Sequence, residues 1–100
     1  MARKTSLTVN SIPVELDYFV GGYVYHVVAG IVASLKDTGT IKNLELDVAG
    51  DDRVQIALNG VDVPLNYFAT QIIQNTLAGM VSNLRGVTEE MRTLELRITQ

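Results

Sequence analysis

Cysteine and tryptophan are absent from this chain of 100 residues, and histidine occurs once, at His26. Without cysteine the chain can form no disulfide, and it offers neither a thiolate nucleophile nor a zinc–thiolate site. Charged residues are also few, at 19%, and 8 basic against 11 acidic side chains give a net charge of −3. Because the acidic residues are scattered and the basic residues form no patch, neither nucleic acid nor an anionic membrane is an expected partner.

Hydrophobic residues account for 47% of the sequence, which is enough for one compact core. We therefore expect a single domain over residues 1–100, with the cytoplasm as its default location. The first residues are basic, but an alternating pattern follows them in place of the apolar core of a signal peptide. Residues 18–35 carry no formal charge over nearly the length of a membrane span. Three glycines in this stretch and a more polar counterpart later in the chain make a transmembrane helix unexpected.

The chain resembles itself at an offset of 49 residues. Residues 7–19 match residues 56–68 in their order of apolar, turn-forming and aromatic residues, and the match continues through the helical segments. One inserted residue later, the closing segment 44–48 matches residues 94–98. Such ordered self-similarity predicts an internal duplication, with repeats over about residues 5–49 and 54–99.

Each repeat begins with the pattern of a β-hairpin. Asn59-Gly60 is typical of a two-residue type I′ turn, because both turn residues need a positive φ angle. Pairing across this turn places the aliphatic residues of both strands on one face. The same register puts Pro64, and Pro13 in the first repeat, at positions that do not donate to the partner strand. The second strand of each hairpin is therefore expected to be short or to lie at a sheet edge.

A helix and a closing strand follow each hairpin. Asp17 and Asn66 are the expected N-caps, because their side chains can accept hydrogen bonds from the first helical turn. The helices are expected to run to about Lys36 and Arg85, with glycines at positions 39 and 86 near their ends. Residues 44–48 and 94–98 then alternate aliphatic with charged residues, as strands with one buried and one wet face do.

These elements predict an α+β fold. We expect a two-layer sandwich in which a mainly antiparallel sheet is covered by two helices, built from hairpin, helix and strand twice over. The alternative is a ferredoxin-like βαββαβ arrangement, which applies if residues 12–16 and 61–65 lead into the helices instead of forming strands.

One stretch of the second repeat carries a resemblance. Its residues are the Asn59-Gly60 turn, then Val63, Leu65-Asn66 and Phe68, and finally Gly79-Met80-Val81 and Leu84-Arg85-Gly86-Val87. Over residues 54–87 this resembles a signature of short uncharacterised prokaryotic proteins, and the first repeat departs from it at Ser11, Asp17, Ile31 and Lys36-Asp37. The resemblance implies a type of fold and no activity.

The outer faces of the two helices differ in polarity. A helical projection at 100° per residue gives the second helix an ordinary polar outer face, with Gln71, Gln74, Asn75, Ser82 and Arg85 opposite the apolar stripe. In the first helix the same projection places an inner stripe on Val20, Tyr23, Val24, Val27, Val28, Ile31 and Leu35. The matching outer positions of the first helix are mostly small or aromatic.

A helix that is apolar nearly all round needs a cover on both sides. We therefore predict that the protein forms a homo-oligomer, with a dimer favoured, through an interface of Tyr18, Gly22, Tyr25, His26, Ala29, Val32 and Ala33. The alternatives are that a terminus or the loop at residues 36–43 covers this face, or that Tyr18, Tyr25 and His26 line a pocket for a small ligand at the subunit junction.

The residues that could carry chemistry form no motif. His26 has no carboxylate, serine or cysteine within helical reach, and the charged pairs on the closing strands, Glu45 with Asp47 and Glu95 with Arg97, are typical of a solvated face. Asp51-Asp52 has the pattern of a turn and lacks the further oxygen ligands of a calcium loop. We therefore expect a non-enzymatic assembly module without catalytic residues, metal or cofactor.

Overall fold

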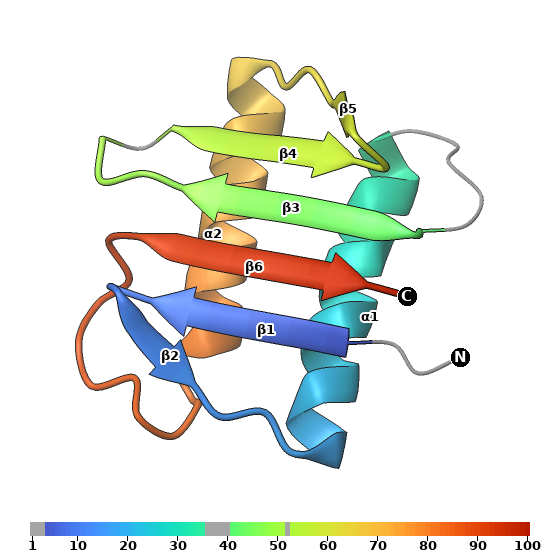
Figure 1. Cartoon of the computed structure of the whole chain (residues 1–100). Helices are drawn as coiled ribbons and strands as arrows, with labels where there is room; N and C mark the ends of the chain where they lie inside the picture. The colour runs from blue at the N-terminus through green and yellow to red at the C-terminus, as the bar shows by residue number, and fades with distance from the viewer. Residues whose placement is uncertain (1–3, 36–40, 52) are drawn as a thin grey trace.

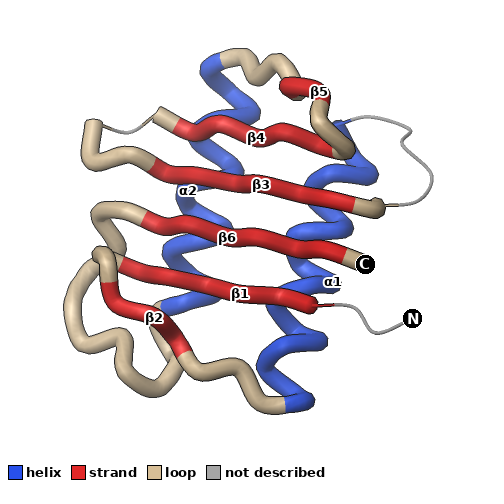
Figure 2. The backbone as a smooth tube through the Cα atoms, viewed as in Figure 1, coloured by secondary structure: helices blue, strands red, loops and turns tan. Residues whose placement is uncertain are grey.

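The computed structural model describes residues 4–35, 41–51 and 53–100. Within these residues the chain forms one antiparallel six-stranded sheet, with two helices lying side by side behind one face of it (Figure 1, Figure 2). The expected α+β class is therefore confirmed at the level of one antiparallel sheet and two helices, an arrangement compatible with a two-layer sandwich. The expected helix end at Lys36 and the glycine at position 39 lie outside the described residues.

The elements follow one another as hairpin, helix and strand, and then again as hairpin, helix and strand. Their bounds are β1 Lys4–Val9, β2 Ile12–Val14, α1 Tyr18–Leu35, β3 Asn43–Val48, β4 Val54–Leu58, β5 Val61–Asp62, α2 Tyr67–Val81 and β6 Leu94–Thr99. β2 and β5 are only 3 and 2 residues long and lie at the two edges of the sheet, as the prolines predicted. The remainder of each expected second strand is a lead-in to the helix.

The strand order β2-β1-β6-β3-β4-β5 places the two closing strands, β3 and β6, at the centre of the sheet. Each hairpin pairs with the closing strand of the other half. Leu7 of β1 faces Leu96, and the corresponding Ile56 of β4 faces Leu46. Leu46 and Leu96 in turn face each other across the central pair. The strand pairs β1–β6 and β4–β3 therefore have the same register.

Both hairpin turns adopt the positive backbone angles of a type I′ turn. Asn59 and Gly60 have φ angles of 51° and 83°, as predicted, and Asn10 and Ser11 have φ angles of 51° and 67°. Residues other than glycine adopt this region at a cost, which asparagine bears best. Ser11 is therefore the strained position of the first turn.

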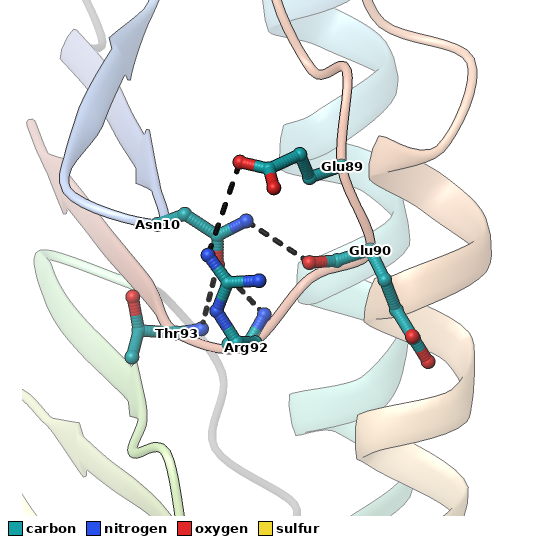
Figure 3. Close-up of polar contacts among 5 residues, drawn as sticks. All are labelled: Asn10, Glu89, Glu90, Arg92 and Thr93. Carbon is teal, nitrogen blue, oxygen red and sulfur yellow. Dashed lines mark hydrogen bonds and ion pairs between the residues drawn. The ribbon is translucent and has the colours of Figure 1, made fainter.

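The asparagine of the first turn also fixes the start of a closing strand (Figure 3). The side-chain Oδ1 of Asn10 accepts hydrogen bonds from the backbone N–H groups of Arg92 and Thr93, at 2.7 and 3.0 Å. The Nδ2 group of Asn10 donates to the carbonyl of Glu90 at 3.0 Å. An exposed ion pair between Arg92 and Glu89, at 3.9 Å, lies beside it. The turn thereby holds the chain just before β6.

The second turn does the same for the other closing strand. The side-chain Oδ1 of Asn59 accepts from the backbone N–H groups of Lys42 and Asn43, at 2.8 and 2.9 Å. The sequence predicted both asparagines as turn residues. It gave no sign that their side chains act as clamps on β3 and β6.

The helices begin where their caps were expected. Asp17 accepts from the N–H of Val20 at 2.8 Å, and Asn66 accepts from the N–H of Ala69 at 2.7 Å. The second helix ends at Val81, about one turn before the expected Arg85. The chain turns after Val81 and passes through Gly86, which has a φ angle of 86°.

The core lies between the helices and one face of the sheet. Its fully buried side chains come from both helices and from the central strands: Val24, Val28, Val32, Ile73, Leu77, Val81, Leu44, Leu46, Leu94, Leu96 and Ile98. Among the described residues no polar or charged residue is buried. The opposite face of the sheet has no helix on it (Figure 1).

Candidate assembly surface on the helix layer

The large apolar side chains that remain exposed fall at equivalent positions of the two halves. Within the described residues they form four pairs separated by 49 positions: Ile12 and Val61, Tyr18 and Tyr67, Phe19 and Phe68, and Tyr23 and Ile72. Three of the pairs lie on the helices. Phe19 is 76% exposed and Phe68 is 71% exposed, so most of each ring is open to solvent.

The structure divides the predicted interface into three groups. Tyr18, His26 and Ala33 are exposed, whereas Gly22, Tyr25 and Ala29 are half-buried. Val32 is 1% exposed and faces the sheet, so its place on an outer face was wrong. Exposed Phe19 and Tyr23 lie instead on the part of α1 that points away from the sheet, and sequence reasoning did not select them.

The error is one of helix rotation. The projection placed the inner stripe of α1 too close to Tyr23, but the buried side chains are Val24, Val28 and Val32. The second helix shows the same shift: the projection placed Ile72 and Thr76 on the apolar stripe that faces the core, but both are exposed. The cause is common to both helices: Tyr23 and Ile72, at equivalent positions, are apolar but exposed, so an apolar side chain at this position does not mark the side that faces the core.

A hollow of about 990 Å³ lies beside the N-terminal half of α1. Tyr18, Gly22 and His26 of the predicted interface line it, together with Lys4 and Phe19. Two consecutive helical glycines, at positions 21 and 22, open this space, and the other helix has Thr70 and Gln71 at the matching positions. A Cβ atom at Gly22 would meet no heavy atom within 4 Å. Packing within the chain therefore does not require this glycine, although glycine costs about 1 kcal/mol inside a helix.

Tyr25 does not join the other candidate residues at this hollow. It packs against the core, and its ring meets that of His26 edge to face, with centroids 5.2 Å apart and planes at 78°. Of the three residues predicted to line a ligand pocket, Tyr18 and His26 line this hollow and Tyr25 does not.

Among the described helices, α1 is long and apolar enough to cross a membrane by length and composition alone. Its mean hydropathy is 1.5 over 18 residues, and 17% of these are buried. The helix nevertheless packs on the sheet through its three buried valines. What distinguishes α1 is therefore an apolar surface that residues 4–35, 41–51 and 53–100 leave largely uncovered.

The open face of the sheet carries the charged residues of the closing strands. Arg97 contacts Asp47 across the central strand pair at 2.9 Å, and this hydrogen bond raises the pKa of Arg97 further above its ordinary value. Glu45 and Glu95 lie next to this pair on the same face. Within the described part of the chain, His, Asp and Glu side chains form no group that could hold a metal ion.

No protein family, curated protein or solved structure matches this chain. The resemblance of residues 54–87 to short prokaryotic proteins therefore stays a prediction, and the function is argued from the helix layer.

Proposed function

We propose that this protein is a non-enzymatic assembly module that forms a homodimer through the outer face of its helix layer. The observation that supports this is the set of exposed apolar side chains on α1 and α2, which occur at matching positions of both helices: Tyr18, Phe19, Tyr23, Tyr67, Phe68 and Ile72. The interface predicted from the sequence lay on α1 alone, and the interface proposed here includes α2 as well.

The area of these side chains is sufficient for a dimer. At about 200 Å² for a fully exposed aromatic side chain, the six side chains together expose on the order of 800 Å². A standard protein interface buries about 800 Å² on each partner. The side chains form two groups, one in the N-terminal part of each helix, so a partner that buries this area has to cover both groups.

We also propose that the two halves arose by duplication of one hairpin-helix-strand unit. Offsets of 49 and 50 residues relate the turns, the caps, the register and the exposed apolar positions. A duplicated unit explains why both helices carry aromatic residues at the start of their outer faces, and it makes an isologous twofold contact the simplest arrangement of two copies.

Sedimentation velocity tests the proposal on matched variants. The wild-type protein is expected to sediment as a dimer, and Phe19→Ser with Phe68→Ser is expected to shift it to a monomer, because both rings lose their apolar contact. Ile12→Ser with Val61→Ser is the control, since these side chains are similarly exposed, at 54% and 57%, but lie on the edge strands. A monomeric wild-type protein, or a control that dissociates equally, would overturn the proposal.

A charge on the outer face of α1 gives a second test. Ala33 is exposed and suits this purpose, whereas Ala29 packs against the core and would report on folding instead. Ala33→Arg is expected to give a folded monomer, with circular dichroism as the check on folding. A folded dimer would mean that the contact does not include this part of α1.

The second candidate function is binding of a small ligand in the hollow beside Tyr18 and His26. Its support is the volume, about 990 Å³, near the upper end of known ligand sites. Native mass spectrometry of freshly purified protein separates the two functions. A reproducible extra mass that Gly22→Gln removes favours the ligand, and a bare dimer favours assembly.

A further inference from the structure

We infer that Phe19 of each copy packs into a groove between α1 and α2 of the other copy. This inference rests on the proposed homodimer and specifies how its two helix layers meet.

The groove has a volume of about 490 Å³ and lies where the C-terminal half of α1 passes the N-terminal half of α2. Gly30, Ser34 and Leu35 line it from α1, and Phe68, Ala69 and Ile72 line it from α2. The lining also includes the partly buried Ile31 and the buried Ile73, so an occupant would contact side chains that belong to the core or pack against it.

The opposite end of the helix layer shows what kind of group fits such a space. There the equivalent of Ile72 is Tyr23, whose hydroxyl reaches across from α1 to the backbone carbonyl of Met80 on α2, at 3.5 Å. The equivalent of Ala69 is the larger Val20. An aromatic ring of the same chain thus spans the helices at one end, and the described residues leave the other end open.

The open groove calls for an apolar occupant. Of its two polar lining side chains, Ser34 donates its hydroxyl to the carbonyl of Gly30, and Asn66 caps α2 through the N–H of Ala69. Both are engaged in their own helices. Phe19 is a ring without a polar atom, and it projects on the side of α1 away from the sheet.

The antiparallel helices make the contact reciprocal. α1 and α2 run in opposite directions behind the sheet (Figure 1). Phe19 is the second residue of α1, whereas the groove is lined by the C-terminal half of α1, so the two lie at opposite ends of the helix layer. When two copies stack helix layer to helix layer, with the twofold axis between the two layers and perpendicular to the helices, each Phe19 lies over the groove of the other copy. The contact occurs twice and closes, as an isologous dimer requires.

Two single variants and their mixture test the inference. Phe19→Ala removes the ring, and Gly30→Leu fills the groove, where a Cβ atom would meet nothing within 4 Å. Each is expected to raise the dimer Kd about a thousandfold, because the symmetric dimer loses both contacts and each hot-spot side chain contributes about thirtyfold. Gly30→Ala, which adds one methyl group, is the control and is expected to remain dimeric.

Mixing the two variants restores one of the two contacts, because the Gly30→Leu chain still has Phe19 and the Phe19→Ala chain still has an open groove. The heterodimer is therefore expected to have a lower Kd than either variant homodimer. At a protein concentration between these values, native mass spectrometry is expected to show the heterodimer and neither homodimer. If Gly30→Leu dimerises like the wild type, this inference falls and the proposed function stands. If the wild type is a monomer carrying a hydrophobic ligand that Gly30→Leu loses, both fall.

Discussion

The two helices of this protein are alike where they face the sheet and differ where they face each other. Both bury an equivalent set of aliphatic side chains, and both start with an exposed Tyr-Phe pair. At one end of the layer Tyr23 spans the helices, whereas at the other end Ile72 and Ala69 leave a groove. The sequence located the difference between the halves in the polarity of the outer helix faces. The structure locates it mainly in the contacts between the helices at the two ends of the layer.

The largest expected effect tests the equivalence of the two halves in the core. Leu46 and Leu96 face each other at the centre of the sheet and are both fully buried. Leu46→Ala and Leu96→Ala are each expected to lower the free energy of unfolding by about 3 kcal/mol through lost burial and a cavity. Urea denaturation measures both. A difference of more than about 1 kcal/mol between them would break the equivalence of the halves.

The next effect concerns the asparagine clamps. Asn10→Ala and Asn59→Ala each remove an acceptor for two backbone N–H groups and place alanine at a positive φ angle. We expect a loss of about 2–3 kcal/mol for each. The aspartate variants keep the acceptor and are expected to lose less than half as much. Equal losses for aspartate and alanine would show that the clamp contributes little.

The sequence predicted the parts of this fold that depend on local chemistry. Asn59-Gly60 gave the turn type, Asp17 and Asn66 gave the helix starts, and the two prolines gave the short edge strands. Each of these signals acts within a few residues, so no knowledge of the packing was needed. The order of the strands required the whole chain, because each hairpin pairs with the closing strand of the other half.

The surface was harder to predict. The rotation of α1 was wrong, so Val32 was placed outside and Tyr23 inside. Val61 was expected to share the buried face of its hairpin, but it is exposed because β5 lies at the sheet edge. The groove depends on how far apart the two helices lie, and no pattern along the chain encodes that distance.

The hairpin turns offer a sharper and smaller comparison. Ser11→Gly is expected to stabilise the protein by about 0.5–1 kcal/mol, because glycine adopts a positive φ angle without strain. Gly60→Ser at the matching position is expected to destabilise it by a similar amount. Thermal unfolding of both variants beside the wild type measures the pair. Shifts of the same sign would mean that the two turns are not equivalent.

The smallest effect is expected at the junction of the two halves, where Arg53 contacts Asp51 at 2.8 Å on an exposed surface. The hydrogen bond from Arg53 lowers the pKa of Asp51 below its ordinary 3.8. A lowered folded-state pKa stabilises the fold above pH 3.8, and this contribution is lost as the pH falls through the folded-state pKa. Because the carboxylate is fully exposed, solvent screens the interaction. Arg53→Gln is therefore expected to return the pKa of Asp51 toward 3.8 in an NMR titration and to leave the unfolding midpoint at pH 7 unchanged. If Arg53→Gln lowered the unfolding midpoint as far as Gly60→Ser does, the ion pair at the junction would contribute to the stability of the whole fold. The pairing of the strands would then not be enough to hold the two halves together.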